Sequence, residues 1–421
     1  MKKTTFFIAA IATLLCTNCS NDEPEVNLPK QPVSSNPYRV SLNDAVDAAL
    51  PLLNQLDGLR TRSNRQISDI EYVVQDLRTR SNSEPYALDT TIYIVNFKDD
   101  NGFAILGADK RVPAILGLSN TGNIDLNDTT ENEAFAQCLG NIKCTASYGP
   151  GLGLKDSVPN IGNIGIIPDK QYINLKNKIS PMITKAVSKW GQKGDFSKYC
   201  NPYNVFPYRY TVGCGPLAAA MITTYYKWPN KIDDLVLNWN IINTWELDPS
   251  SIMIQEIPDI IPQYLAKVQK KLGATNGPGG NTALTSNDFI KNFPKLGYAQ
   301  VGTPKDFSDN AAYQALMSKS PLMMVGFNQD KTDGHMWVVD GSLLYSECYG
   351  GDLNTYKEYY LFHCVWGYDG LNNGYFLFNN SSKSMNMLDP KEFEEYEGSG
   401  SPSISKTYYD IKFWSNFTPI K

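Results

Sequence analysis

Cys214 is the residue of this 421-residue chain whose neighbours best suit nucleophilic chemistry. It lies in Gly213-Cys214-Gly215-Pro216 and precedes a run of good helix formers, so the pattern predicts a thiol at the N-terminus of a helix. Unpaired backbone N–H groups and the helix dipole stabilise a thiolate there, and the thiolate is the reactive form of cysteine. The alternative is a buried structural cysteine, so Cys214 alone does not establish a function.

His335 supplies the base that a cysteine nucleophile needs. It follows Gly334 and opens a β-type run that includes Trp337, Val338 and Val339, so we expect a histidine at the start of a strand. A nucleophilic cysteine and its histidine are commonly distant in sequence and adjacent in space. The other histidine, His363, lies within a later β-type run and is expected to be a packed sheet residue.

Two further side chains could assist this pair. The amide of Gln192 could join the Cys214 N–H in binding a developing oxyanion, and loss of one such donor typically costs about 10²- to 10³-fold in rate. Trp366 could shield the imidazole if its strand neighbours that of His335. The ordinary alternatives are a surface glutamine and a core tryptophan.

Composition excludes several other classes of function. Hydrophobic residues make up 42% and charged residues 19% of a chain with net charge −5, which indicates a globular protein and argues against a dedicated nucleic-acid binder. With two histidines and no Cys-x-x-Cys pair beyond the first 19 residues, the usual zinc sites are excluded. The Gly-rich turn at residues 276–281 lacks the Gly-Lys-Ser/Thr ending of a phosphate-binding loop, so a nucleotide site is not expected there. The chemistry of Cys214 and His335 requires neither a metal nor an organic cofactor, and none is expected.

The first residues are typical of an export signal. Lys2 and Lys3 precede an apolar run at residues 6–15, so residues 1–18 are predicted to be a signal peptide, with lipid attachment at Cys19 and a flexible tether over residues 19–38. We therefore expect an exported cell-envelope protein, anchored by lipid at the outer membrane or cell surface, with plain secretion or release after processing as alternatives.

The elements that must position these residues fall into two folded parts. Residues 39–145 predict a small α+β unit, with a helix over residues 41–59 capped by Ser41 and a hairpin formed by residues 91–96 and 103–106. Residues 146–180 are rich in Gly and Pro and predict a linker with the processing site. The pattern of residues 181–421 predicts helices followed by strands, which indicates a larger α+β domain.

Cysteine counting leaves the disulfides open. The chain has eight cysteines, and Cys16 and Cys19 lie in or beside the signal, so six remain. An oxidising compartment would allow these six to form disulfides. If one of the six stays a thiol, an odd number is left, so a complete disulfide framework is not predicted.

Four ordered motifs together resemble the streptopain family of papain-like cysteine peptidases. These are Trp190-Gly-Gln192 with residues 201–204, the Gly-Cys helix of residues 213–229, the histidine motif of residues 334–341, and residues 366–376. Residues 94–117 are similar to the inhibitory propeptide domain that accompanies these enzymes. The resemblance implies a papain-like α+β peptidase domain preceded by a small α+β propeptide domain.

The resemblance also implies a function. It assigns Cys214 as nucleophile, His335 as base, and Gln192 and Trp366 as supporting residues of a cysteine endopeptidase zymogen that cleaves proteins or peptides. The propeptide would be its intramolecular inhibitor, removed by cleavage. The family usually has Asn before the tryptophan, whereas this chain has Val365, so a carbonyl or water would have to hold the second imidazole nitrogen. Acyl transfer to an amine, and a degenerate homologue that binds peptides or inhibits peptidases, remain alternatives.

Overall fold

The structure, a computed structural model, describes eleven segments of the chain. These are residues 38–56, 65–75, 89–110, 112–125, 132–148, 171–204, 208–246, 256–327, 334–349, 356–378 and 410–421. The predicted signal peptide, Cys19 and the tether up to residue 37 lie outside them. Within these segments, no helix combines the length and apolar character needed to cross a membrane.

The described chain contains both helices and strands. The α-helices are α1 (Leu42–Leu56), α2 (Glu133–Tyr148), α3 (Lys185–Ser188), α4 (Cys214–Tyr226), α5 (Trp239–Thr244), α6 (Ile260–Leu272), α7 (Ser286–Asn292) and α8 (Asp309–Met317). The 3-10 helices are η1 (Lys98–Asp100), η3 (Gly194–Ser197), η4 (Pro278–Gly280) and η5 (Phe293–Leu296). The strands are β1 (Ile67–Gln75), β2 (Asp89–Phe97), β3 (Phe103–Gly107), β4 (Ile115–Ser119), β5 (Gln171–Ile179), β6 (Lys231–Ile232), β7 (Leu235–Val236), β8 (Thr275–Asn276), β9 (Thr282–Ala283), β10 (Lys305–Asp306), β11 (Leu322–Phe327), β12 (Gly334–Tyr349), β13 (Lys357–Val365), β14 (Gly374–Leu377) and β15 (Asp410–Trp414).

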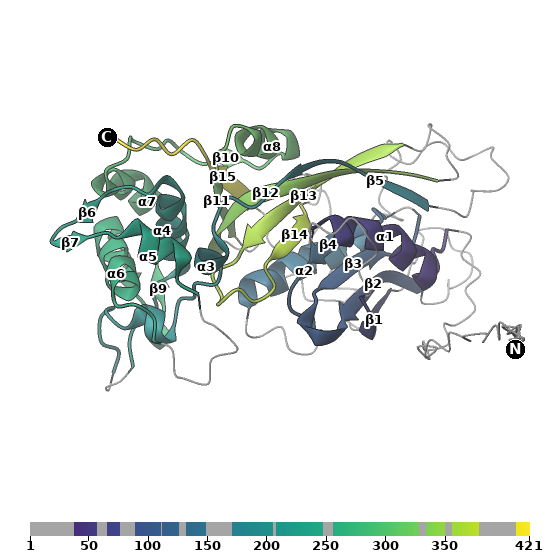
Figure 1. The fold of residues 1–421 in the computed structure, drawn as a ribbon, viewed down its shortest axis with the longest axis horizontal. Helices are drawn as coiled ribbons and strands as arrows, with labels where there is room; N and C mark the ends of the chain where they lie inside the picture. The colour runs from purple at the N-terminus through teal and green to yellow at the C-terminus, as the bar shows by residue number, and fades with distance from the viewer. Residues whose placement is uncertain are drawn as a thin grey trace, which may run out of the picture. The chain divides into compact units, whose positions relative to one another are not determined.

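One sheet runs through both folded parts. Its order is β1-β2-β3-β4-β14-β13-β12-β11-β15-β10, and β5 pairs with β12 outside this path. The N-terminal part joins the C-terminal part where β4 pairs antiparallel with β14, with Leu118 opposite Tyr375. Figure 1 shows β12, β13 and β14 side by side, with α4, α5, α6 and α7 grouped near β11.

The N-terminal elements form where local sequence predicts them. Ser41 caps α1, because its Oγ accepts a hydrogen bond from the Asp44 N–H at 3.2 Å, and Pro51 is accommodated inside the helix. β2 and β3 form the expected antiparallel hairpin, whose turn places Asp99 and Asp100 at positive φ. Asp tolerates this left-handed conformation better than most residues, so the polar turn suits the hairpin.

The segment predicted as a linker carries regular structure at both ends. α2 runs to Tyr148, and β5 occupies residues 171–179 as a partner of β12. The Gly and Pro residues that suggested a linker end at Pro168, and the sequence of β5, Gln171 to Ile179, contains neither. A strand can therefore form there once β12 offers a partner edge, which a local pattern does not reveal.

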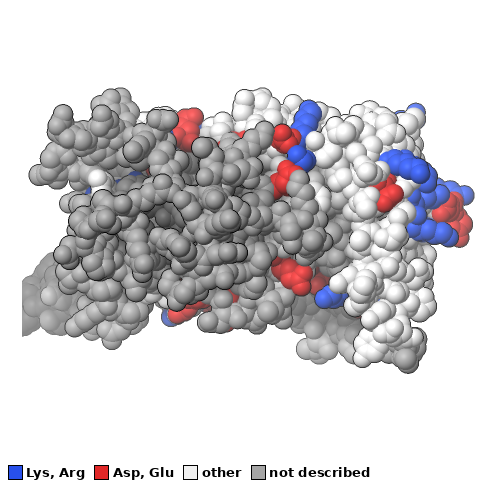
Figure 2. Space-filling model, turned by 180° about the vertical axis from the view of Figure 1, so that it is seen from behind, with Lys and Arg blue, Asp and Glu red and all other residues white. Residues whose placement is uncertain are grey.

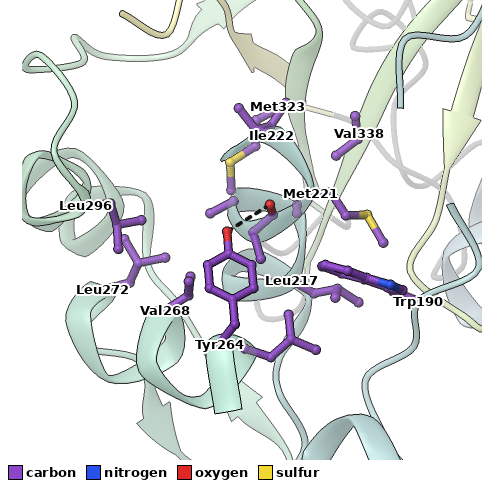
Figure 3. Packing of buried hydrophobic residues seen from close by; sticks show 14 of the residues in the cluster. Trp190, Leu217, Met221, Ile222, Tyr264, Val268, Leu272, Leu296, Met323 and Val338 are labelled. Atoms are coloured by element: carbon purple, nitrogen blue, oxygen red, sulfur yellow. Dashed lines mark hydrogen bonds between the residues drawn. The ribbon is translucent and has the colours of Figure 1, made fainter. Parts of the chain in front are cut away.

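α4 lies at the centre of the larger apolar core. Residues 215–224 of the helix are all buried, and Figure 3 shows Leu217, Met221 and Ile222 among side chains from α6 and the sheet. Tyr264 of α6 donates a hydrogen bond to the Ala220 carbonyl at 3.2 Å. Burial of each large aliphatic side chain stabilises by roughly 1.5–3 kcal/mol, so the helix is firmly held.

The charged side chains do not form a basic surface on the visible face. In the part of this face that the structure describes, Lys and Arg side chains stand beside Asp and Glu side chains (Figure 2). Ion pairs such as Lys267 with Asp234 and Lys271 with Asp233 fit this mixed pattern. A mixed surface gives little attraction for a polyanion, in agreement with the net charge.

Candidate active site

Cys214 is the first residue of α4 and is half-buried. Gly213 precedes it at φ 87°, in the left-handed region, and a Cβ there would lie 2.8 Å from the Thr282 carbonyl oxygen. Both the backbone conformation and the lack of space therefore require glycine at this position. The turn delivers the thiol to the helix N-terminus, where backbone N–H groups favour a thiolate.

The chain leading to Cys214 is fixed by the Gly-rich turn and α6. The Gln269 side chain donates hydrogen bonds to the carbonyls of Thr211 at 2.8 Å and Val212 at 3.0 Å. The Thr211 N–H donates to the Gly280 carbonyl at 2.9 Å, and the Thr282 hydroxyl donates to the Thr211 carbonyl at 2.7 Å. The glycine-rich turn thus has a structural role, as a support for the residues before Cys214.

Gln192 lies beside this same chain. The Val212 N–H donates to the Gln192 carbonyl at 2.8 Å, and the glutamine side chain is half-buried. A Cβ at Gly191 would lie 2.2 Å from Oδ1 of Asp369, so only glycine fits against this carboxylate, whose pKa is raised by burial. The structure therefore brings Gln192 next to the segment that ends at Cys214.

His335 is the second residue of β12 and is buried, with 6% of its surface exposed. Its ring stacks on Trp337 at 6.2 Å between centroids and lies 5.5 Å from the ring of Tyr368. Nε2 lies 2.9 Å from the carbonyl oxygen of Trp366. Because a carbonyl can only accept, Nε2 carries the proton, and in the neutral ring Nδ1 is the basic nitrogen.

The first turn of α4 packs against the start of β12 and the segment after β13. A Cβ at Gly215 would lie 2.9 Å from Sδ of Met336, and a Cβ at Gly367 would lie 2.9 Å from Cδ2 of Leu217. Gly215 follows Cys214, Met336 follows His335 and Gly367 follows Trp366. The three predicted site segments therefore meet in one place.

Trp366 contributes through its backbone. Its carbonyl meets the imidazole, while its indole Nε1 donates to the Asn372 carbonyl at 2.9 Å and packs 5.4 Å from the Trp337 ring. The carbonyl contact is the arrangement expected when Val365 replaces the usual asparagine. The sequence-based expectation that the indole covers the imidazole is not what the ring contacts show, because Trp337 and Tyr368 lie against His335.

His363 has a structural position, as its sequence context indicates. Its Nδ1 lies 2.6 Å from Oδ1 of the fully buried Asp340. The other carboxylate oxygen accepts from the Ile183 N–H at 2.8 Å. This pair ties the segment before α3 to β12 and β13.

Asn373 is the main residue that sequence reasoning missed. Its Oδ1 accepts from the Trp366 N–H at 3.0 Å, and its Nδ2 donates to the Ser188 carbonyl at 2.8 Å. The only sequence signal is its place before Gly374 in a turn-rich stretch, where an asparagine is ordinary.

Metal and disulfide chemistry find no support in the described segments. They hold no group of three or more His, Cys, Asp or Glu residues that could bind a metal ion. Cys138, Cys200, Cys348 and Cys364 form no disulfide there, and burial raises the pKa of Cys138 and Cys364 well above the usual value. A high pKa makes these two thiols unreactive.

Comparison with known proteins assigns the family. Residues 190–376 match the Peptidase C10 family, and residues 34–145 match the Spi protease inhibitor family. Residues 190–376 of the chain belong to the Peptidase C10 family. This C10 peptidase is 24% identical over 324 residues to streptopain of Streptococcus pyogenes serotype M28 (strain MGAS6180). The match covers 68% of this chain and 73% of that protein. A streptopain of Streptococcus pyogenes is 23% identical over the same length.

Two solved structures are also similar to this C10 peptidase. A fragment of Prevotella intermedia prointerpain A has a TM-score of 0.46 and 14% identity, covering 82% of this chain and 98% of the fragment. Active wild-type Prevotella intermedia interpain A cysteine protease has a TM-score of 0.34 and 16% identity, covering 51% of this chain and 91% of that chain. The two family matches carry the assignment: a papain-like cysteine peptidase with an N-terminal inhibitor-type propeptide domain.

Besides the pairing of β4 with β14, side-chain hydrogen bonds join the described residues of the propeptide domain to the peptidase domain. Near the active site, the Ser119 hydroxyl donates to the Asn373 carbonyl at 2.7 Å and the Asn132 amide donates to the Leu371 carbonyl at 2.8 Å. Further along β12, Glu347 accepts from the Ala114 N–H at 2.8 Å. Burial raises the pKa of Glu347 to about 7.

Proposed function

We propose that this C10 peptidase is an exported cysteine endopeptidase, made as a zymogen, that hydrolyses peptide bonds with Cys214 and His335. Cys214 is the nucleophile because its thiolate is favoured at the N-terminus of α4. His335 is the base because the Trp366 carbonyl holds Nε2–H and makes Nδ1 the basic nitrogen. The contact of 2.9 Å between Nε2 of His335 and the Trp366 carbonyl oxygen is the single observation that carries the proposal.

The reaction follows from these assignments. The Cys214 sulfur attacks the scissile carbonyl, forming a C–S bond, and His335 receives the thiol proton. The oxyanion is stabilised by the Cys214 N–H and the Gln192 amide. His335 then gives its proton to the departing amine as the C–N bond breaks, and water, deprotonated by His335, hydrolyses the thioester and restores the thiol.

Zymogen control is supported by the propeptide contacts. Ser119 and Asn132 hold residues 371 and 373, which lie on the loop after Trp366. Because Trp366 orients His335, a propeptide bound to this loop can restrain the active site. Cleavage between the two domains would release it.

Export and lipid attachment rest on the first residues of the sequence. The apolar run at residues 6–15 and the following Cys19 support a signal peptide and a lipid anchor at the cell envelope. Replacement of Cys19 by Ser should move the protein from the membrane fraction to the soluble fraction and remove the added lipid mass. An unchanged distribution and mass would contradict the anchor.

The reading as a degenerate homologue is not favoured. Its motives are Val365 and the intact inhibitory domain, but the Trp366 carbonyl holds Nε2 of His335 without an amide at position 365, and an inhibitory domain equally suits a zymogen. A binding protein has no need of a histidine held in one tautomer.

Maturation and labelling test the proposal directly. The chain without its signal is incubated under reducing conditions beside Cys214→Ala and, as a matched control, Cys348→Ala, which removes a half-buried thiol of β12. Mass is followed over time, and an epoxide thiol probe is then added. We expect the parent and the control to mature and to be labelled at Cys214, and Cys214→Ala to stay intact. If the parent neither matures, even after an added protease cuts between the domains, nor takes the probe at Cys214, the proposal is wrong.

A further inference from the structure

We propose that Asn373 is a positioning residue of the active site, which holds Trp366 so that its carbonyl orients His335. This inference rests on the proposed function, because it takes His335 as the catalytic base. Asn373 would act through Trp366 and would touch neither the substrate nor the reacting atoms.

The side-chain amide of Asn373 joins two segments that meet at the site. Oδ1 accepts from the Trp366 N–H at 3.0 Å, and Nδ2 donates to the Ser188 carbonyl at 2.8 Å. Because one partner can only donate and the other can only accept, the two bonds fix the amide orientation. Ser188 is the last residue of α3, the helix that leads to Gln192. The Asn373 amide therefore connects the segment that holds His335 to the segment that carries Gln192.

These bonds restrict the direction of the Trp366 carbonyl. The residue is held at its N–H by Asn373, at its indole by the Asn372 carbonyl at 2.9 Å, and at its own carbonyl by His335. Gly367, which follows at φ 80°, lets the chain turn directly after this carbonyl. Loss of the Asn373 bond would free the N–H end of Trp366 and let the carbonyl move away from Nε2.

Val365 explains why this support is needed. Its side chain is buried in the apolar core with 1% exposed, so position 365 offers His335 no polar group. The imidazole is held by the Trp366 carbonyl instead, and the direction of this carbonyl depends on how the backbone of Trp366 is held. Asn373 provides a side-chain amide that acts on His335 through Trp366, whereas position 365 provides none.

The arrangement is expected to persist after maturation. Both side-chain bonds of Asn373 go to residues of the peptidase domain, namely Trp366 and Ser188. Among the described residues of the propeptide, Ser119 reaches Asn373 at its backbone, where the carbonyl accepts from the Ser119 hydroxyl. Removal of the propeptide therefore leaves the positioning bonds in place.

Variants at this position separate positioning from a merely structural role. Asn373→Ala and the isosteric Asn373→Leu remove both bonds, whereas Asn373→Asp keeps an acceptor for the Trp366 N–H and loses the donor to Ser188. The control is Asn292→Ala, a buried asparagine away from the site whose amide donates to the Leu272 carbonyl at 2.8 Å. Each full chain is matured, and kcat, KM and the pH dependence of Cys214 alkylation are measured.

The inference predicts a specific pattern. Asn373→Ala and Asn373→Leu should lose about tenfold in kcat, as expected for one misplaced hydrogen bond, with little change in KM. Their thiolate should form closer to the free cysteine pKa of about 8.5, because a poorly held imidazolium stabilises it less. Asn373→Asp should recover part of both properties, because it restores the acceptor for the Trp366 N–H while its second oxygen faces the Ser188 carbonyl. Asn292→Ala should lower stability and leave the pH profile unchanged.

The outcomes are distinguishable from failure of the proposed function. A parent enzyme without peptidase activity overturns the proposed function and this inference with it. If the parent is active and Asn373→Leu has the same kcat and the same pH profile of Cys214 alkylation, this inference alone is overturned. The same holds if Asn373→Asp is as impaired as Asn373→Leu, or if Asn292→Ala shifts the alkylation profile equally.

Discussion

The carbonyl oxygen of Trp366 accepts a hydrogen bond from Nε2 of His335 at 2.9 Å. This contact fixes the tautomer of the imidazole and leaves Nδ1 as the basic nitrogen. It also makes the active site depend on backbone that the propeptide domain touches at Asn373.

Replacement of Gln192 by Ala should lower kcat by about 10²- to 10³-fold, because one donor to the oxyanion is lost. The rate of Cys214 alkylation should stay close to that of the parent, since thiolate formation precedes the oxyanion. Gln300→Ala, which removes an amide bonded to the Ile290 carbonyl away from the site, is the control. Equal kcat in Gln192→Ala and the parent would contradict the assignment.

Replacement of Ser119 by Ala should speed maturation of the full chain several-fold, because the propeptide loses its hydrogen bond to the Asn373 carbonyl. A typical hydrogen bond contributes roughly 0.5–1.5 kcal/mol, which corresponds to about 2- to 12-fold. Processing half-times are measured by mass. Ser318→Ala, which removes a hydroxyl directly after α8, should mature at the parent rate, and identical half-times in all three chains would count against the contact.

Glu347 should make the unprocessed chain less stable as pH rises towards neutrality. Burial raises its pKa in the folded chain from 4.5 to about 7, so between these values the folded state binds more protons than the unfolded state. The contribution of Glu347 to the free energy of unfolding is therefore highest below about pH 4.5. It falls by up to about 3 kcal/mol until the carboxylate is fully charged above about pH 7.

The Glu347 prediction is measured by urea unfolding of Cys214→Ala chains across this pH range. Adding Glu347→Gln, which stays neutral, should reduce the dependence, and the part that remains includes Asp309, whose pKa is also raised to about 7 by burial. Glu358→Gln, at an exposed position of β13, should keep it. A Glu347→Gln chain with the parent slope would show that other groups cause the pH dependence.

Replacement of Gly213 by Ala should destabilise the protein by about 1–3 kcal/mol through backbone strain, and by more through the clash with the Thr282 carbonyl. Gly194→Ala is the matched control, because Gly194 has φ 60° but no atom within 4 Å of its Cβ position. Unfolding free energies of the two variants isolate the clash. Equal losses would mean that the turn before Cys214 is less crowded than the structure indicates.

Sequence reasoning succeeded where the signal is local. The start of α4 at Cys214, the cap of α1 at Ser41 and the β2–β3 hairpin each depend on residues within a few positions of one another. The position of His335 at a strand start follows in the same way. Such features are set by glycine, capping and strand propensity, which a single sequence displays.

Other features depend on partners far along the chain. β5 forms because β12 offers an edge, and β4 and β14 pair although more than two hundred residues separate them. Asn373 has an ordinary sequence context, and its role arises only when Trp366 and Ser188 are brought to it. Local propensity carries no information about such contacts, so the structure was needed to find them.

The pH dependence of Cys214 alkylation tests the central claim most directly. The matured enzyme and a His335→Ala variant, matured by an added protease, are treated with iodoacetamide from pH 4 to 10, and the peptide that contains Cys214 is quantified by mass. We predict that the parent reacts well below the free cysteine pKa of about 8.5 and that His335→Ala reacts only near that value. A parent that reacts only near pH 8.5, or a variant with the parent's profile, would contradict the Cys214–His335 pair.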